Sequence, residues 1–203
     1  MRKIKKGIEP KSLTRWKRRY PDRTYIQLSD AIRRDIRQHL LNDQYYLCAY
    51  CCDRISSIDE CHNEHLEARK HTPQRSLDFS NLVASCNTIN QCGQAHAAQS
   101  LPLTPLQDAC ESELVYQLSG RVQGITPQAK QTIQVLNLNH KALVEKRKQL
   151  THCLLWDNAL DPMAIQVSSP ESLIQLVDDL ALPQQGKLDA FSPVVINVLR
   201  LLL

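Results

Sequence analysis

Apolar residues recur at helical spacing near the start of the chain. Between residues 28 and 41, apolar side chains return at every fourth position, at Ile32, Ile36 and Leu40. This spacing places them on one face of a helix, which can then pack against a core. Ser29 or Asp30 can cap the first turn, because a short polar side chain accepts a hydrogen bond from a free backbone N–H group there. The pattern predicts an amphipathic helix near residues 28–41.

The second half of the chain also has helical periodicity. Pro127 suits the first turn of a helix, where a backbone N–H group is not needed. The apolar positions that follow fit a long amphipathic helix that could break at "NLNH", and they are Ile133, Leu136, Leu143, Val144 and Leu150. Ser169-Pro170-Glu171 predicts the start of another helix, and the apolar tail after Pro193 predicts the last one.

A segment of a different kind lies between these helical regions. Residues 45–100 are rich in Cys and His and lack long apolar runs. The two prolines of "SLPLTPL" mark the end of this segment, and the chain before about Pro21 is expected to be an extended arm. We therefore divide the chain into a basic N-terminal arm and helix (residues 1–44), a Cys- and His-rich module (residues 45–100) and a helical C-terminal region (residues 101–203).

Length and composition limit the core that the chain can build. With 203 residues, of which 42% are apolar, it can bury one core, or one core and a small satellite module. The longest apolar run, "VVINVLRLLL", is too short to cross a bilayer. The basic N-terminus lacks the apolar stretch of a signal peptide. We expect a cytoplasmic protein that does not insert into a membrane.

The positive charge is concentrated at one end of the chain. Residues 1–23 contain ten Lys and Arg against Glu9 and Asp22, so the arm accounts for the whole net charge of +4. Basic side chains interleaved with Trp16 and Tyr20 suit phosphate contacts and base stacking. The predicted nucleic-acid contacts are Lys3, Lys5, Lys6, Arg15, Lys17, Arg18 and Arg19. The alternative is a solvated tail that docks on the body or on an acidic partner.

Eight cysteines in a cytosolic chain favour metal binding over disulfides. Cys48 and Cys51 are two residues apart in the spacing that lets both thiolates bind one Zn²⁺ from a tight turn. Cys86 and Cys92 form a second pair with a longer spacer. We predict a structural zinc bound by these four residues, which would supply much of the folding free energy of a segment with few large apolar side chains.

The remaining cysteines provide the alternatives to this ligand set. Cys52 and Cys61 are the nearest competing ligands, and some of the four predicted ligands could instead be buried thiols. Cys110 and Cys153 fall in predicted helices, where we expect them to serve in packing.

Two polar stretches lie between the cysteine pairs, "CHNEHLEARKH" from Cys61 and "LDFSNLVASC" from Leu77. In order along the chain, Cys-x2-Cys is followed by Glu64-His65, Asn81-Leu82 and the second cysteine pair. This arrangement resembles the HNH endonuclease family. The resemblance covers about residues 1–150, where "LCAYC" and "TIQVLNLNHKALVEKR" are similar to the small PtuB-like HNH proteins of Septu-type and retron-associated anti-phage systems.

The resemblance implies a fold that is mostly α with a small zinc-stapled ββα-metal module, and a phosphodiester hydrolase. This reaction needs a base for water and a cation for the leaving 3′ oxygen. His65 suits the base, because a neutral imidazole accepts a proton near pH 7. Glu64, its neighbour on a strand, would point to the other side and reach a divalent ion. Asn81 could hydrogen-bond the backbone near His65 and hold the imidazole in position.

The chain departs from the family pattern at the last ligand of the catalytic ion. An Asn or His commonly follows the second zinc cysteine, but here Gly93 follows Cys92. The candidate substitutes are His96, one turn into the helix, and Asn90, in the preceding loop. Asn90 with Glu64 would offer only oxygens and suit Mg²⁺, whereas the imidazole of His96 would favour Mn²⁺. Either ion would be separate from the structural zinc.

The other histidines carry weaker signals. His62 lies two residues before Glu64, on the same face of the strand, so it could add a metal or phosphate contact. His71 follows two basic residues and could face phosphate or solvent. His39, His140 and His152 fall in predicted helices and are assigned no function.

We therefore expect a metal-dependent HNH endonuclease that cuts DNA or RNA. The resemblance implies a toxic anti-phage effector controlled by a partner ATPase of the ABC type (PtuA-like), with reverse transcriptase and multicopy single-stranded DNA as further partners in retron versions. The sequence has no glycine-rich phosphate loop, so ATP would belong to another chain. The alternative, favoured by Gly93, is a zinc-knuckle adaptor that binds nucleic acid or a partner with weak or no catalysis.

Overall fold

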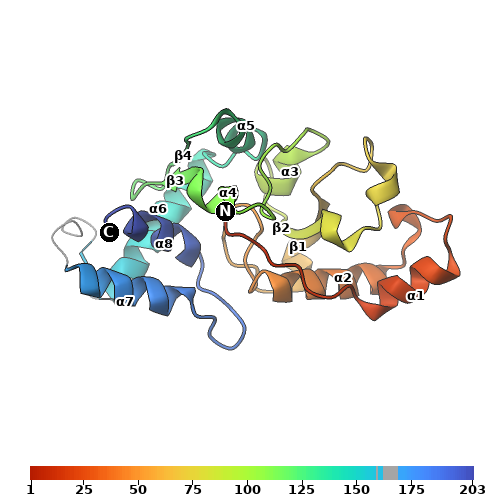
Figure 1. The fold of residues 1–203 in the computed structure, drawn as a ribbon, viewed down its shortest axis with the longest axis horizontal. Helices are drawn as coiled ribbons and strands as arrows, with labels where there is room; N and C mark the ends of the chain where they lie inside the picture. The colour runs from red at the N-terminus through yellow and green to blue at the C-terminus, as the bar shows by residue number, and fades with distance from the viewer. Residues whose placement is uncertain (159, 162–168) are drawn as a thin grey trace.

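The computed structural model describes residues 1–158, 160–161 and 169–203, and in it helices flank two small pairs of strands along an elongated body (Figure 1). About half of the chain is helical. The helices are α1 (Lys11–Arg19), α2 (Asp30–Asp43), α3 (Cys92–His96), α4 (Ala109–Ser112), α5 (Pro127–Val135), α6 (Lys141–Asp157), α7 (Pro170–Ala181) and α8 (Ser192–Arg200). The strands are β1 (Cys61–His65), β2 (Leu82–Cys86), β3 (Leu114–Tyr116) and β4 (Val122–Gly124).

Both strand pairs are antiparallel. In the first pair, β1 and β2 place Cys61 opposite Cys86 and His65 opposite Leu82. The second pair, β3 and β4, lies in the C-terminal region that we expected to be helical throughout. That expectation is wrong for these residues, because strands of three residues are too short to show the alternation by which a strand is recognised.

Caps and prolines begin the helices where the sequence indicates. Ser29 accepts a hydrogen bond from the backbone of Ile32 at the start of α2, and Ser169 accepts one from Ser172 at the start of α7. The predicted break at "NLNH" is confirmed, since α5 ends at Val135 and α6 begins at Lys141. These boundaries depend on contacts within a few residues, which a sequence displays directly.

The expectation of an extended arm up to about Pro21 is wrong. Helix α1 occupies residues 11–19 and packs against α2, with Leu13 and Trp16 buried. Two apolar side chains three residues apart share one face of a helix, and this face provides the contact. Two apolar residues among many charged ones give too weak a periodic pattern to predict this helix from the sequence.

Two apolar clusters hold the molecule together. The larger one joins the N-terminal segment, α2, the β1–β2 hairpin, the cysteine-rich turn and the β3–β4 pair. The smaller one lies between α6, α7 and α8, and it includes Leu155, Leu176, Leu180, Val195 and Leu199. In Figure 1 these three helices form the end of the molecule opposite to α1. None of the described helices is both long enough and apolar enough to cross a bilayer.

Candidate functional site

Four cysteines that are distant in the sequence converge in one buried cluster. The sulfur atoms of Cys48, Cys51, Cys86 and Cys92 all lie within 4.8 Å of one another. Around a tetrahedral Zn²⁺ with bonds of about 2.3 Å, sulfur atoms are about 3.8 Å apart, so the donor set fits this ion. Cys52 and Cys61, the competing candidates, are buried but lie outside the group.

A tight turn and the end of the hairpin hold the cluster. The N–H of Cys48 donates to the carbonyl of Asp53 (2.9 Å), and the N–H of Cys52 donates to the carbonyl of Cys48 (3.1 Å). From β2, the N–H of Cys86 donates to Sγ of Cys48 (3.4 Å). Cys52 and Cys92 have left-handed φ values of 65° and 55°. Such backbone is costly for non-glycine residues and persists where surrounding contacts fix it. A thiolate–metal bond would provide such a contact for Cys92.

The four thiols influence one another's protonation. Contact with Cys48 raises the pKa of both Cys51 and Cys92. Hydrogen bonds from Cys48, Cys51 and Cys92 lower the pKa of Cys86. These opposite shifts arise because adjacent buried negative charges repel, so ionisation of Cys86 disfavours ionisation of Cys51 and Cys92. A zinc ion would replace the protons and allow all four to ionise.

Glu64, near the end of β1, contacts two imidazoles. Its Oε1 atom lies 2.6 Å from Nδ1 of His96 in α3, and its Oε2 atom lies 3.2 Å from Nε2 of His62. Asn90 is exposed, and its backbone carbonyl accepts a hydrogen bond from Nδ2 of Asn137 (2.7 Å). Among the described residues no hydrogen bond joins Asn90 to Glu64. The structure thus brings His96 to the carboxylate, adds His62, and leaves Asn90 apart.

The carboxylate of Glu64 is held in its ionised form. Burial raises the pKa of Glu64, but hydrogen bonds to His62 and His96 outweigh burial, so the net shift is downward. Burial lowers the pKa of His62, but its hydrogen bonds to Glu64 and Asn87 outweigh burial, so the net shift is upward. A buried, ionised carboxylate beside two imidazole rings is a suitable environment for a divalent cation, because carboxylate oxygens and imidazole nitrogens both bind such ions.

His65, the next residue of β1, points to the opposite face of the hairpin. Its Nε2–H group donates to the carbonyl of Ser76 (3.0 Å), which leaves Nδ1 as the unprotonated nitrogen. The ring also meets Tyr25 edge-on, with centroids 4.8 Å apart. Burial, helped by the charge of Arg69, lowers the pKa of His65 below its ordinary value. A neutral imidazole near pH 7 is the result.

Asn81, just before β2, forms hydrogen bonds to the backbone on both sides of the loop that follows His65. Its Oδ1 atom accepts from the N–H of Glu67 (2.8 Å), and its Nδ2 group donates to the carbonyls of Glu67 (3.1 Å) and Arg75 (3.3 Å). Glu67 follows His65 by two residues, and Arg75 precedes Ser76. The amide therefore links both backbone segments that determine where the imidazole lies.

Three residues of the site are not predicted by any sequence pattern. Tyr25 and Ser76 contact His65 from segments far along the chain. Tyr50 lies between Cys48 and Cys51, and its ring is steeply inclined to that of His96, with centroids 6.5 Å apart. Its buried hydroxyl has no hydrogen-bond partner among the described residues. Its position between the two cysteines of the Cys-x2-Cys turn is the sequence feature that could have indicated that it lies near the site.

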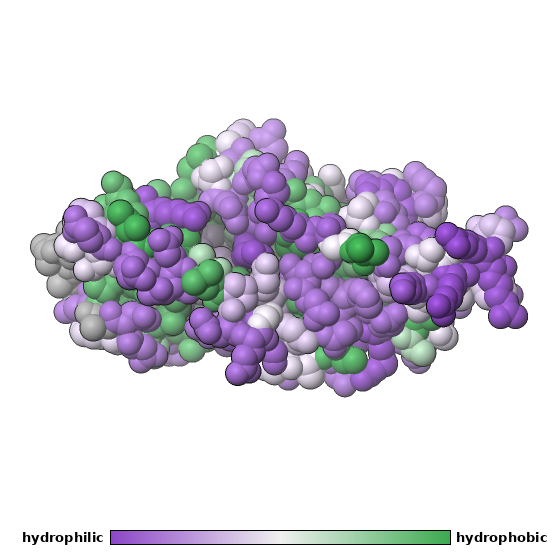
Figure 2. All heavy atoms as spheres, turned by 60° about the horizontal axis from the view of Figure 1, so that its bottom comes forward, coloured by the Kyte–Doolittle hydropathy of each residue, from purple (hydrophilic) through white to green (hydrophobic). Residues whose placement is uncertain are grey.

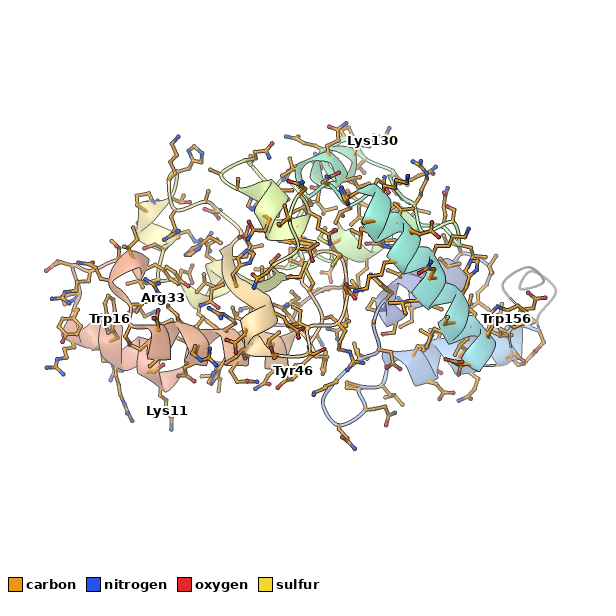
Figure 3. All side chains as sticks on the ribbon, turned by 180° about the vertical axis from the view of Figure 1, so that it is seen from behind. Lys11, Trp16, Arg33, Tyr46, Lys130 and Trp156 are labelled. Atoms are coloured by element: carbon orange, nitrogen blue, oxygen red, sulfur yellow. The ribbon has the colours of Figure 1, made fainter. Side chains whose placement is uncertain are left out.

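The predicted basic contacts divide into two groups. Lys3 and Lys6 form ion pairs with Asp108 and Asp43, which hold the N-terminal segment to the body. Lys17 pairs with Glu9 inside the same segment. Lys5, Arg15, Arg18 and Arg19 are exposed, and the described residues include no acidic partner within ion-pair distance of them. Strongly hydrophilic side chains gather at the α1 end of the molecule (Figure 2), and Lys11 extends outward from this helix (Figure 3).

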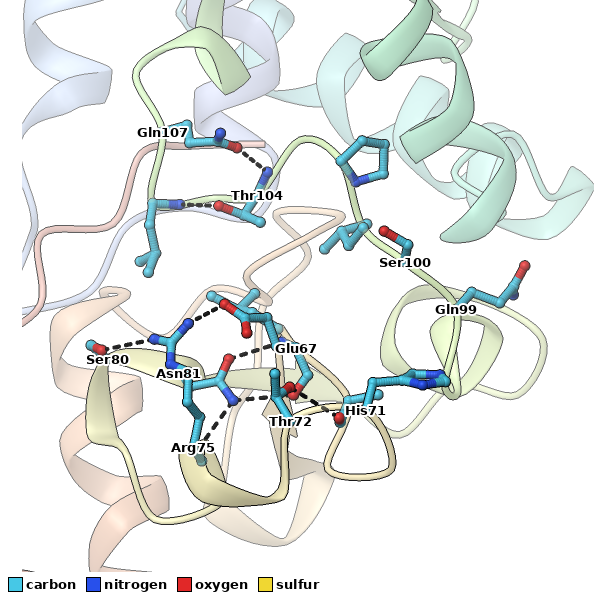
Figure 4. Close-up of a pocket in the computed structure, with 15 residues that line it drawn as sticks. Glu67, His71, Thr72, Arg75, Ser80, Asn81, Gln99, Ser100, Thr104 and Gln107 are labelled. Atoms are coloured by element: carbon cyan, nitrogen blue, oxygen red, sulfur yellow. Dashed lines mark hydrogen bonds and ion pairs between the residues drawn. The ribbon is translucent and has the colours of Figure 1, made fainter.

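Two cavities border the loop between β1 and β2. The first, of about 580 Å³, is lined in part by Glu67, His71, Arg75 and Asn81 (Figure 4), and neither His65 nor Glu64 lines it. The second, of about 470 Å³, brings Lys17 and Arg23 together with Ser76, the residue that binds His65. The second cavity therefore connects the basic end of the molecule to the segment that holds the imidazole.

Comparisons with known proteins give one relevant similarity. A scan against models of protein families finds no match. Among curated proteins, the chain is 32% identical over 101 residues to the proposed HNH endonuclease of retron Ec83 from Escherichia coli. The alignment covers 42% of this chain and 37% of that protein. The similarity supports a relationship to the HNH family over this limited part of both chains.

Proposed function

We propose that this chain is a metal-dependent HNH endonuclease that hydrolyses phosphodiester bonds of DNA or RNA. The observation that carries the proposal is the pair of neighbours at the end of β1, with the carboxylate of Glu64 against His96 and the imidazole of His65 against Ser76. The similarity to the retron Ec83 protein supports the same class of chemistry.

The opposite directions of Glu64 and His65 suit an in-line displacement at phosphorus. In such a reaction the attacking water and the leaving oxygen lie on opposite sides of the phosphate. Neighbouring residues of a strand point to opposite faces. A phosphodiester that crosses the end of β1 would therefore meet the imidazole on one side and the carboxylate group on the other.

His65 would act as the general base. Because its Nε2–H group is committed to Ser76, Nδ1 is available to take a proton from water. The water oxygen forms a bond to phosphorus, the bond from phosphorus to the 3′ oxygen breaks, and the proton remains on His65. Asn81 would position this residue through its hydrogen bonds to Glu67 and Arg75.

Glu64 and His96 would hold the divalent ion, whose charge stabilises the leaving oxygen. An imidazole ligand favours Mn²⁺ over Mg²⁺. The four-cysteine cluster would hold a separate structural zinc that fastens β2 and α3 to the turn at residues 48–51.

We further propose that the nuclease is a toxic effector of anti-phage defence, controlled by a partner ATPase of the ABC type, with reverse transcriptase and multicopy single-stranded DNA in a retron arrangement. The retron named in the similar protein supports this context. The sequence contains no glycine-rich phosphate loop, so ATP would be bound by the partner. Expression without the partner should arrest growth of the host, and His65→Ala should relieve the arrest.

A zinc-knuckle adaptor without catalysis is the second candidate. The observation that favours it is the enclosure of the reactive groups, because His65 is only 7% exposed and Glu64 already contacts two imidazoles. An adaptor would bind nucleic acid or a partner protein through the same zinc-fastened module.

Incubation of the purified protein with supercoiled plasmid and with labelled RNA, in Mg²⁺ or Mn²⁺, separates the two functions. We expect cleavage of at least one substrate, and His65→Ala should reduce the rate by about 10²–10⁴-fold, the usual loss of a general base. His39→Ala is the matched control, because His39 is half-exposed on α2 and, within the described part of the chain, its ring bonds to Asp35 of the same helix.

Zinc content and melting temperature should be unchanged in both variants. Binding without cleavage by the wild type, with partner ATPase and either metal present, would contradict the nuclease and favour the adaptor.

A further inference from the structure

Gly93, directly after the zinc ligand Cys92, lies so close to the Glu64 site that it has no room for a side chain. A Cβ atom on Gly93 would lie 2.6 Å from Nε2 of His62 and 2.9 Å from both Oε2 of Glu64 and Oγ of Ser85. Its N–H donates to the same Ser85 hydroxyl (3.0 Å). The imidazole of His62 therefore occupies the space that a side chain at the start of α3 would need.

Hydrogen bonds to carbonyl oxygens determine where the two imidazoles of the site carry their protons. Nδ1 of His62 lies 2.9 Å from Oδ1 of Asn87, and the amide is oriented by a hydrogen bond from its Nδ2 group to the carbonyl of Asp59 (3.1 Å). Nε2 of His96 lies 2.8 Å from the carbonyl of Gln99. An amide or backbone oxygen only accepts, so these two nitrogens are the protonated ones.

The remaining nitrogens, Nε2 of His62 and Nδ1 of His96, both face the carboxylate of Glu64. In neutral imidazoles these nitrogens present lone pairs, which repel the carboxylate oxygens. Either an additional proton on each ring or a shared cation removes the repulsion. One divalent ion would satisfy all three side chains.

We infer that His62 is a third protein ligand of the divalent ion proposed at Glu64 and His96, and that it replaces the ligand that Gly93 cannot supply. For the existence of this ion, the inference rests on the proposed function. Histidines that bind metals typically donate their other ring N–H to a carbonyl or carboxylate oxygen, as both of these do. The ligand thus comes from strand β1 and not from the first turn of α3.

The hydroxyl of Tyr50 provides independent support for a ligand in this region. It is fully buried without a hydrogen-bond partner among the described residues, and its ring meets the His96 ring at a steep angle of 68°. A buried polar group without a partner is expected to bond to something that the occupied site holds.

The test measures Mn²⁺ binding to the zinc-loaded protein in the absence of nucleic acid. Pulsed electron paramagnetic resonance detects nitrogen nuclei bound to Mn²⁺, and we expect two coordinated imidazoles in the wild type. His62→Ala should leave one imidazole and weaken Mn²⁺ binding by about tenfold or more, as removal of a ligand typically does. His71→Ala, in the neighbouring loop, should change neither quantity.

A second pair of variants tests the exchange of ligands between strand and helix. Gly93→Ala should weaken Mn²⁺ binding with His62 intact, because the added Cβ displaces the imidazole. His62→Ala/Gly93→His should recover two coordinated imidazoles, because the double variant moves the ligand into the vacated space. Zinc content and melting temperature establish that each variant is folded.

The outcomes separate this inference from the proposed nuclease activity. One imidazole on Mn²⁺ in the wild type, or unchanged binding in His62→Ala, would overturn the role of His62 even if the protein cuts nucleic acid. Two imidazoles that fall to one in His62→Ala would establish the ligand even if no substrate is cut.

Discussion

At the residue scale, Lys6 is a basic side chain near the N-terminus whose ammonium group is largely buried. Its Nζ atom lies 3.8 Å from the centroid of the Phe79 ring, 2.9 Å from the carbonyl of Leu82 and 3.8 Å from Asp43. Burial lowers its pKa to about 8, against the opposing effect of Asp43. The residue that we expected to contact phosphate thus helps to hold the N-terminal segment against β2.

The depressed pKa of Lys6 predicts a stability that rises with pH. The folded pKa of about 8 is below the ordinary value of 10.5, so between these pH values the unfolded chain binds a proton that the folded chain does not. The free energy of unfolding should therefore increase across this window, by up to about 3 kcal/mol from this group. Urea unfolding of the wild type and of Lys6→Met at several pH values measures the difference.

The control for this measurement is Lys5→Met, because Lys5 is exposed. The difference between wild type and Lys5→Met should not change with pH from 8 to 10.5. An equally flat difference for Lys6→Met would show that Lys6 has an ordinary pKa.

At the element scale, the cysteine cluster joins the β1–β2 hairpin to α3, because Cys86 ends β2 and Cys92 begins α3. Helix α3 is short, and Cys92 at its start is tied by its backbone N–H to the carbonyl of Leu136 (2.8 Å). A helix of this length has little stability of its own. Because α3 carries His96, loss of the cluster would also displace the group that contacts Glu64.

Removal of one cluster cysteine should release metal and destabilise the module. Cys86→Ser should lose about one zinc per chain, with a stability loss of about 3 kcal/mol or more and a melting temperature lower by about 10 °C. Cys153→Ser is the control, because Cys153 is exposed on α6. Metal analysis and thermal unfolding give the result, and full zinc content in Cys86→Ser would disprove the four-cysteine assignment.

Helix α1 presents one apolar face to α2 and basic side chains to solvent. Leu13 and Trp16 are buried, whereas Arg15, Arg18 and Arg19 are exposed. Deletion of the arm would remove part of the core, so charge substitution is the better test of its role in binding.

The triple variant Arg15→Gln, Arg18→Gln, Arg19→Gln should bind nucleic acid more weakly and with less salt dependence. Each lost contact to duplex DNA lowers the slope of log K against log salt by about 0.9, so three contacts lower it by about 3. The same charge is removed from exposed positions elsewhere in Arg121→Gln, Lys130→Gln, Lys141→Gln, which should retain the slope. Fluorescence anisotropy at several salt concentrations measures both, and equal slopes would exclude α1 from the binding surface.

At the scale of the whole molecule, two separate apolar clusters stabilise the fold. The larger cluster supports the cysteine turn and the hairpin, and the smaller one joins α6, α7 and α8 at the other end (Figure 1). The site residues named above contact the first cluster. Packing lost within the smaller cluster should therefore have no direct effect on the cysteine cluster or on Glu64.

A cavity in the smaller cluster should loosen one end of the molecule. Leu199→Ala removes a side chain with 0% exposure, and such changes typically cost about 2–5 kcal/mol. Hydrogen exchange should accelerate in α7 and α8 more than in β1 and β2, while zinc content stays unchanged. Uniform acceleration across both ends would instead indicate a single cooperative unit.

Much of the secondary structure followed from the sequence alone. The cap of α2 at Ser29, the break between α5 and α6, and the start of α7 at Ser169 each depend on residues only a few positions apart. The spacing of the cysteines indicated a metal cluster, and the structure brings these four sulfurs together. Local hydrogen bonding and side-chain periodicity determine such features, and both depend on residues that are close together in the sequence.

Only the tertiary structure decided which distant groups meet. It brought His96 and His62 to Glu64 and left Asn90 outside, it placed Ser76 on His65, and it packed the arm as α1. The short β3–β4 pairing also depends on residues brought together by the fold. Contacts of this kind depend on how the whole chain packs around its core. Several side chains in the sequence have suitable chemistry for the site, and only burial and close packing determine which of them meet.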